Sequence, residues 1–333
     1  MNDGIILTLA YPETIVSHAE EWYSPLLKYV SIGNKNYVRA GHAALILIDK
    51  ATGVLEYHDF GRYITASPYG RVRGKETDFE LNFPIKATIQ NNKITNTKDI
   101  LKYFASIPEL THGDGKLYAS VCNAIDYQKA RSFIDAMQHK GLIRYAAFIK
   151  DASNCARFVA DTLIASVTDE MILSQLKKSK WFTPSTIGNV ILADTENDVY
   201  VVSENGNISE FKSNIKRENR KYFLDRLKHH ESDWSGKLEP KHNSEKSDHA
   251  QWLGGIAAGA WFEIHDIGST IQYRFRRISP YGDINCDGIY QINMEGFDLN
   301  SDHNFIHYSN CRFFQIRQGE MTYRFDYIKN FND

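Results

Sequence analysis

The sequence lacks the features that would place the protein outside the cytoplasm or on a strongly charged partner. Only four cysteines occur in 333 residues, and their spacing fits neither a CxxC pair nor a dense disulfide framework. The first residues carry no basic region ahead of their short apolar run, so no signal peptide is predicted. No apolar stretch is long enough to span a bilayer. The net charge of −2 gives no electrostatic basis for binding nucleic acid or an anionic membrane surface. We therefore expect a cytoplasmic protein without stable membrane insertion.

What is present is an ordinary globular composition, with 42% hydrophobic and 24% charged residues. The length suggests two or three domains. Helix and strand patterns predict a mixed α+β domain over residues 1–180, followed by a β-hairpin and helix extension over 181–230. Residues 231–250 are polar and turn-rich, which predicts a linker. Residues 251–333 carry many short, aromatic-rich strand patterns, and this favours a separate all-β domain, either a sandwich or a barrel.

One cysteine stands where an amphipathic helix is predicted to begin. Residues 155–166 carry apolar residues at helical spacing, and Ser153 or Asn154 is a suitable cap in front of Cys155. A thiol at this position meets unpaired backbone N–H groups and the positive end of the helix dipole, which stabilise a thiolate. The same N–H groups can stabilise a developing oxyanion. Most free cysteines are small buried core residues, so Cys155 needs a catalytic partner before it indicates chemistry.

Two histidines lie at the ends of a predicted β-hairpin. His42 opens an apolar strand, and His58 lies near the end of the strand that follows a Gly-containing turn. In an antiparallel hairpin the start of one strand lies beside the end of the other, so we expect His42 and His58 to be neighbours. One of them would act as base for Cys155 and the other would orient that base. Glu56 and Asp59, which are close in sequence, are alternative orienting groups.

These residues carry a resemblance to a known group of enzymes. The order is histidine, strand, turn, strand, histidine, then a helix, a strand and Asn-Cys-x-x-Phe-Val at the start of a helix. It resembles the permuted papain-like (NlpC-like) cysteine hydrolases, in their YiiX-like and lecithin:retinol acyltransferase-like branches. The resemblance covers roughly residues 1–180 and implies an antiparallel sheet packed on helices. It implies that Cys155 is the nucleophile, His42 the base and His58 the third residue. The whole chain also resembles a bacterial family that joins such a domain to a β-rich C-terminal part.

The chemistry of these residues predicts a cysteine hydrolase. Cys155 would attack an amide bond of the peptide type to give an acyl-enzyme, with His42 as general base. A lipid acyltransferase or thioesterase would use the same residues, but Ala156-Arg157 replaces the acidic residue and histidine usual after the cysteine in acyltransferase-like relatives. A non-catalytic binding protein, which would use its C-terminal β domain to bind a protein partner, is the third possibility. The separation of the Cys155 sulfur from the His42 ring distinguishes this last function from an enzyme.

Two weaker signals concern the remaining charged residues. Residues 283–288 match the first half of an EF-hand-like calcium loop, but the twelfth position is Met294, which cannot supply a carboxylate. Asp287-Gly288 is instead a good hairpin-turn sequence, and we predict neither a metal nor a cofactor. Residues 64–84 are rich in Gly, Pro and charge, which predicts a solvated loop, although its basic residues could meet an acidic substrate group.

Overall fold

The computed structural model describes residues 2–19, 21, 26, 29, 32–228, 230 and 245–332. The chain divides into two compact units, each made of two separate stretches. The first unit comprises Met1–Gly61 and Phe83–Glu231, and the second comprises Arg62–Asn82 and Ser232–Asp333. Residues 62–82 therefore belong with the C-terminal strands, whereas the sequence grouped them with residues 1–180. Residues 231–244 of the predicted linker lie outside the described residues.

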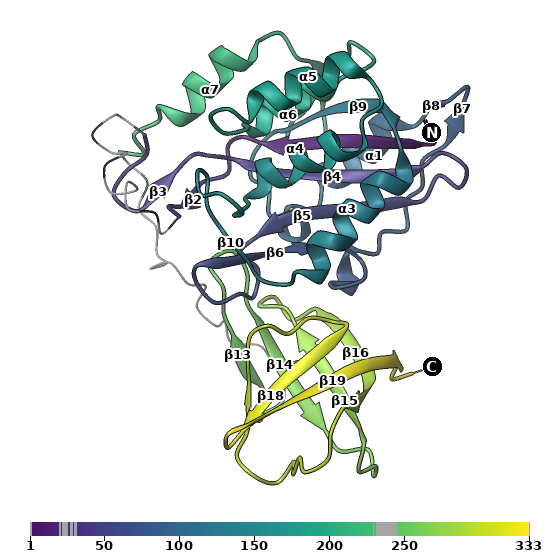
Figure 1. The fold of residues 1–333 in the computed structure, drawn as a ribbon, viewed down its shortest axis with the longest axis vertical. Helices are drawn as coiled ribbons and strands as arrows, with labels where there is room; N and C mark the ends of the chain where they lie inside the picture. Colours follow the sequence, from purple (N-terminus) through teal and green to yellow (C-terminus); the bar gives the residue numbers. More distant parts are fainter. Residues whose placement is uncertain are drawn as a thin grey trace. The chain divides into compact units, whose positions relative to one another are not determined.

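An antiparallel β-sheet forms the centre of the first unit (Figure 1). Neighbouring strands of this sheet within the unit follow the spatial order β5-β4-β1-β9-β11-β12, and β10 belongs to the same sheet. All eight residues of the first strand, β1, are buried, as expected for a continuous apolar run of strand length. The strands are β1 (Gly4–Tyr11), β4 (His42–Asp49), β5 (Leu55–Gly61), β9 (Leu117–Ile125), β11 (Tyr200–Val202) and β12 (Ile208–Glu210). Shorter strands of this unit are β2 (Val16–Ser17), β3 (Tyr37–Val38), β7 (Ile89–Gln90), β8 (Lys93–Ile94) and β10 (Ile143–Arg144).

Helices pack on this sheet and on one another. They are α1 (Thr97–Ala105), α2 (Pro108–Thr111), α3 (Tyr127–His139), α4 (Cys155–Ser166), α5 (Glu170–Ser179), α6 (Thr186–Ala193) and α7 (Ile215–Phe223). Helix α4 contacts strands β4 and β5 as well as helices α3, α5 and α6, and its Phe158, Val159 and Leu163 are fully buried. This burial anchors α4 by its apolar face and fixes where its N-terminus lies. None of the described helices is both long and apolar enough to cross a bilayer.

The second unit is a β-structure with an aromatic core. Its C-terminal strands form one antiparallel sheet in the order β13-β14-β15-β16-β19-β18-β17. The Gln251 side chain on one edge strand accepts a hydrogen bond from the Phe305 N–H on the other at 2.8 Å, so the sheet is nearly closed. Phe275 and Phe314 stack inside it with centroids 4.8 Å apart. The strands are β13 (Gln251–Leu253), β14 (Ala260–His265), β15 (Gln272–Ile278), β16 (Ile284–Ile292), β17 (Asn304–Phe305), β18 (Phe313–Gln318) and β19 (Met321–Asn330).

The earlier stretch of the second unit, residues 62–82, is tied to these strands by backbone hydrogen bonds. The Ile64 N–H donates to the Ala258 carbonyl at 2.9 Å, and the Cys311 N–H donates to the Thr77 carbonyl at 3.0 Å. The stretch contains β6 (Tyr69–Arg73) and a short 3₁₀ helix, η2 (Phe79–Leu81). With these elements in place, the predicted fold class is confirmed: an α+β part with an antiparallel sheet, and all-β C-terminal strands.

The predicted hairpin turn at Asp287-Gly288 is wrong. Both residues lie inside strand β16, where Gly288 is paired with Phe275. The Asp287 carboxylate is held by Arg274 on the neighbouring strand at 2.6 Å. A Cβ atom at Gly288 would lie 2.8 Å from the Tyr327 ring, so the absence of a side chain here allows close packing.

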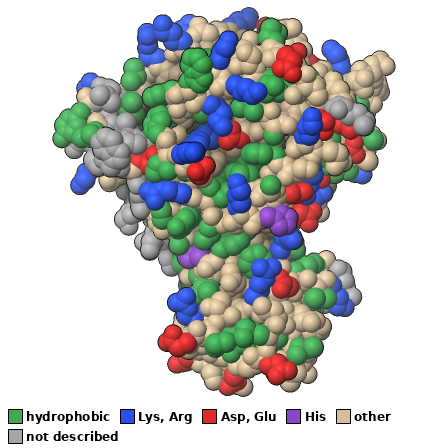
Figure 2. Space-filling model, in the orientation of Figure 1, with side chains coloured by type: hydrophobic (Ala, Val, Ile, Leu, Met, Phe, Trp, Pro, Cys, Tyr) green, Lys and Arg blue, Asp and Glu red, His purple; other side chains and the backbone are tan. Residues whose placement is uncertain are grey.

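On the face drawn in Figure 2, acidic and basic side chains are interspersed with hydrophobic ones.

Candidate functional site

Cys155 is the first residue of helix α4, as predicted from its sequence pattern. Asn154 caps the helix: its side-chain oxygen accepts a hydrogen bond from the Arg157 N–H at 2.9 Å. The amide group of the same side chain donates to the Ala146 carbonyl at 3.2 Å. The thiol is buried, with 7% of the residue exposed, and its sulfur donates to the Gly41 carbonyl at 3.9 Å. The start of α4 therefore meets the start of β4.

The loop that leads into Cys155 is held by charged side chains on two sides. The Arg157 guanidinium donates to the Ile149 carbonyl at 2.8 Å. The Glu21 carboxylate accepts hydrogen bonds from the Ala147 and Phe148 N–H groups at 3.2 and 3.3 Å. These two side chains thus form hydrogen bonds with backbone groups that lie outside helices and strands. They hold the loop in front of Cys155 in position.

His42 is the first residue of β4 and is buried. Its Nε2 lies 3.1 Å from the Asp59 Oδ2 atom, and its side chain is also hydrogen-bonded to that of Cys155. Burial lowers the pKa of His42, but the hydrogen bonds to Asp59 and Cys155 outweigh it and raise the pKa to about 9. The ring therefore lies between a carboxylate and a thiol, the arrangement in which an imidazole exchanges a proton with a nucleophile.

Asp59 takes the position beside His42 that was expected for His58. In the β4–β5 register Asp59 is opposite Ala44, so it lies diagonally across from His42 on the same face of the sheet. The carboxylate is fully buried. Its Oδ2 atom also accepts a hydrogen bond from the Tyr57 hydroxyl at 3.1 Å. Two donors on one oxygen hold the carboxylate in place toward the imidazole.

His58 lies on the opposite face of the sheet, because adjacent residues of a strand point to opposite sides. It is paired with Leu45. Its Nε2 is 3.8 Å from Glu56 Oε2 and 3.5 Å from the guanidinium of Arg131 on helix α3. Arg131 in turn donates to Glu56 at 2.6 Å. The structure thus brings Cys155, His42 and Asp59 together and places His58 and Glu56 in a separate network.

Two residues at the site carried no signal in the sequence. Tyr57 reads as an ordinary aromatic strand residue, yet its hydroxyl supports Asp59. Asn189 on α6 donates from its side chain to the Ala156 carbonyl at 2.8 Å and so braces the first turn of α4. Neither role can be recognised without knowing how the strand and the helix pack.

Across the described ranges, no group of three or more His, Cys, Asp and Glu side chains is arranged to hold a metal ion.

Fold and site together define an α+β protein with a cysteine–histidine–aspartate cluster at a helix N-terminus. Residues 6–172, about half of the chain, match the family model described as type VI secretion system effector TseH-like. The chain belongs to this family. Residues 250–328 match the model of the DUF6695 C-terminal domain. The YiiX-like and lecithin:retinol acyltransferase-like branches predicted from the sequence stay a prediction.

One solved structure illustrates the similarity. It is the crystal structure of the type VI secretion system effector TseH, at 20% sequence identity and a TM-score of 0.42, covering 63% of this chain and 99% of that one. The comparison with curated proteins gives no match. The family assignment therefore rests on the match over residues 6–172.

Proposed function

We propose that this member of the TseH-like effector family is a papain-like cysteine hydrolase that cleaves an amide bond of the peptide type. Cys155 is the nucleophile, His42 the general base and Asp59 the orienting residue. The observation that carries the proposal is the position of the His42 ring, which is hydrogen-bonded to Cys155 and lies 3.1 Å from Asp59. This chain of nucleophile, base and orienting group is the general arrangement for covalent catalysis.

The reaction follows from these positions. His42 takes the thiol proton, and the thiolate attacks the carbonyl carbon of the amide. The first N–H groups of a helix have no intrahelical partner. Asn154 occupies the Arg157 N–H, so we assign the oxyanion to the N–H groups nearest Cys155. The imidazolium protonates the leaving amine, and neutral His42 then activates the water that hydrolyses the acyl-enzyme. A raised pKa of His42 favours the imidazolium needed for the leaving group.

The two positions after the nucleophile support a hydrolase over a lipid acyltransferase. Ala156 is buried, and the Arg157 side chain donates to backbone carbonyls of the preceding loop. Both residues are committed to packing and to the loop rather than to an acyl acceptor. Product analysis with water alone and with an added amine or alcohol separates the two reactions. Free acid as the main product supports the hydrolase, and transfer to the acceptor as the main product contradicts it.

The catalytic proposal is tested on the purified full chain with a library of peptide amides and with iodoacetamide as a thiol probe. Cys155→Ala and His42→Ala should each abolish amide hydrolysis. The matched control is His58→Gln, which changes a buried histidine on the other face of the same hairpin and should retain activity. Full hydrolysis by the Cys155→Ala variant would contradict Cys155 as the nucleophile, and a wild-type chain that hydrolyses none of the peptide amides and does not react with the probe at Cys155 would favour a binding protein.

The family also supports a role as a secreted effector. We propose that a type VI secretion system exports the chain from the cell that makes it. The test compares the amount of the protein in the medium of strains with an intact and with a disabled secretion system, using the Cys155→Ala variant beside the wild type. Equal amounts outside both strains would contradict export by this route, and this result would leave the catalytic test unaffected.

A further inference from the structure

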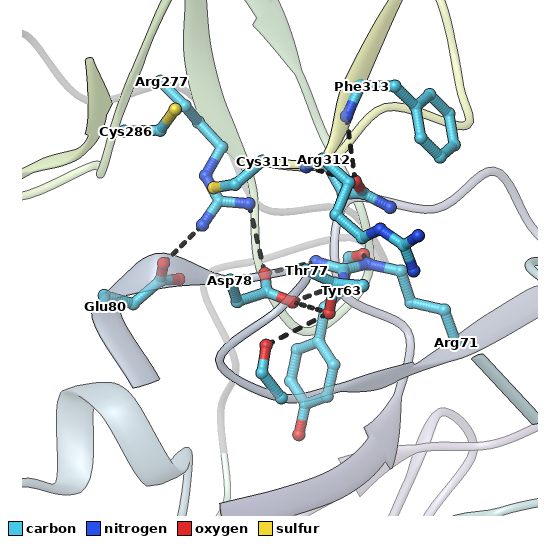
Figure 3. A network of polar contacts seen from close by, with 12 residues as sticks. Tyr63, Arg71, Thr77, Asp78, Glu80, Arg277, Cys286, Cys311, Arg312 and Phe313 are labelled. Atoms are coloured by element: carbon cyan, nitrogen blue, oxygen red, sulfur yellow. Dashed lines mark hydrogen bonds and ion pairs between the residues drawn. The ribbon is translucent and has the colours of Figure 1, made fainter. Parts of the chain in front are cut away.

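A second buried cluster of charged side chains lies in the second unit (Figure 3). Arg71 donates two hydrogen bonds to the Asp78 carboxylate, at 2.6 and 2.7 Å. Arg277 on β15 donates to the same carboxylate at 3.1 Å and to Glu80 at 2.5 Å. Arg71 and Arg277 are each only 1% exposed. The carboxylates therefore hold the Arg277 guanidinium in one position inside the unit.

Two cysteines lie beside Arg277 within this cluster. Figure 3 shows the side chains of Cys286 and Cys311 next to the Arg277 side chain, and Cys286 is the direct cross-strand partner of Arg277 in the β15–β16 register. Both thiols are buried and free. The Tyr290 hydroxyl lies 2.8 Å from the Cys286 sulfur and donates to the Cys311 carbonyl at 2.7 Å. The two cysteines therefore share Tyr290 and Arg277 as neighbours.

The two thiols of this pair differ chemically. The hydrogen bond from Cys311 lowers the pKa of Cys286 despite burial, and Tyr290 and the charge of Arg277 lower it further. Burial, and next the hydrogen bond with Cys286, raise the pKa of Cys311. A thiol of lower pKa beside one of higher pKa is the combination of an attacking and a resolving cysteine in disulfide exchange.

We propose that Cys286 and Cys311 form a redox-active pair that closes an intramolecular disulfide by exchange with a small-molecule disulfide. The Cys286 thiolate attacks one sulfur of the small disulfide, and the first small thiolate leaves. The Cys311 thiolate then attacks the Cys286 sulfur of the mixed disulfide and releases the second small thiolate. The two protons of the protein thiols end on the two small thiols. The protein is oxidised by two electrons, and the small disulfide is reduced by the same two.

The disulfide would covalently join strand β16 to the segment that precedes β18. Such a bridge would persist in an oxidising environment and would open in a reducing cytoplasm, so it would strengthen the second unit after export. The site shares no residue with the Cys155 cluster, which lies in the first unit. A failed test of this pair therefore leaves the catalytic proposal standing, and the reverse is also true.

The experiment exposes the folded full chain to 2-hydroxyethyl disulfide, a small neutral probe suited to buried thiols. The reaction is quenched with acid, and a non-reduced digest is mapped by mass spectrometry. The expected result is a linked peptide that contains Cys286 and Cys311, the loss of two free thiols per chain and an unchanged circular dichroism spectrum. A linked peptide that forms only after unfolding in guanidinium, or a stable probe adduct at Cys286 without the link, would overturn the proposal.

Variants assign the two roles. Cys311→Ser should trap the probe on Cys286, whereas Cys286→Ser should leave Cys311 unmodified. Tyr290→Phe keeps the ring in the core but removes the hydroxyl from the Cys286 sulfur, so it should slow the exchange and give the same final link. The matched control is Cys122→Ser, a buried cysteine of the first unit, which should form the link at the wild-type rate. The main test is made on the wild-type chain, so its result stands even if one of the variants is unstable.

Discussion

Each unit of the protein buries a carboxylate among polar partners, and the two carboxylates differ in what holds them. In the first unit Asp59 lies beside the His42 ring and accepts from the Tyr57 hydroxyl. In the second unit Asp78 accepts hydrogen bonds from two guanidinium groups, those of Arg71 and Arg277. An imidazole can lose its proton at accessible pH, whereas a guanidinium cannot. A buried aspartate is therefore part of a cluster that can transfer a proton in the first unit. In the second unit a buried aspartate is part of a cluster whose cations stay permanently charged.

The surroundings of the two clusters match this difference. The His42 ring is hydrogen-bonded to the Cys155 thiol at the N-terminus of α4, where a negative charge on the sulfur can develop and be stabilised. The Arg71–Asp78–Arg277 cluster joins residues 62–82 to strand β15 and so connects stretches that are far apart in the sequence. Under the proposed function the first cluster carries the chemistry, whereas the ion pairs of Arg71, Asp78 and Arg277 hold the second unit together. The predictions below test this division.

The largest effect is expected from Asp78→Ala. The change leaves two buried guanidiniums without their shared carboxylate, and breaking a buried pair in this way costs about 3–5 kcal/mol. Calorimetry of the full chain should show the unfolding transition of the second unit at a much lower temperature. The control is Asp326→Asn, which removes an exposed ion pair with Arg324 in the same unit and should cost no more than about 1 kcal/mol. Equal shifts in the two variants would contradict a structural role for the buried cluster.

Asp59→Asn should act on rate more than on stability. An asparagine of the same shape cannot hold the imidazolium, so we expect amide hydrolysis to fall by about 10²–10⁴-fold, the usual contribution of general acid–base catalysis. The alkaline limb of the pH–rate profile should also move from near 9 toward the ordinary histidine value of 6.5. His58→Gln, on the neighbouring residue of the strand, should change neither. Similar rate losses in the Asp59→Asn and His58→Gln variants would contradict a specific role for Asp59 in orienting His42.

The sequence predicted part of this site because its signals are local. A cysteine after a capping residue and a histidine at the head of an apolar strand can be recognised from neighbouring residues alone. The choice between Asp59 and His58 could not be made in this way. A slip of one residue in a β-hairpin moves every side chain to the other face, and the sequence of the turn between β4 and β5 does not fix the register to one residue.

The second cluster was beyond sequence analysis for a different reason. Glycine, proline and charge in residues 64–84 predict a solvated loop, but Arg71 is buried because Asp78 compensates its charge, and Arg277 binds the same carboxylate. The contact with Arg277 depends on a strand about two hundred positions further along the chain. Cys286 and Cys311 are likewise brought together only by the order of the C-terminal strands. Such contacts leave no local pattern for sequence analysis to find.

The two clusters should also respond to pH in opposite directions. Arg71 and Arg277 hold the pKa of Asp78 well below its usual range despite burial. The stability that this carboxylate contributes is present above its unfolded pKa and is lost as the pH falls through its folded value. The raised pKa of His42 contributes stability below about 6.5 that is lost as the pH rises through about 9. Denaturation followed across pH should show the second unit weakening in acid, where Asp78→Ala removes the dependence, and the first weakening in alkali.

The smallest expected effect separates the two donors to Asp59. Tyr57→Phe removes one hydrogen bond to the carboxylate oxygen that also faces His42, at a cost of about 1 kcal/mol in stability. Because the hydroxyl stabilises the carboxylate charge, its loss should strengthen the interaction of Asp59 with the imidazolium and raise the pKa of His42. The alkaline limb of the pH–rate profile should therefore move slightly upward, opposite to its shift in Asp59→Asn. A downward shift in both variants would show that Tyr57 acts mainly by holding Asp59 in position, so the direction of this small shift decides how the cluster is built.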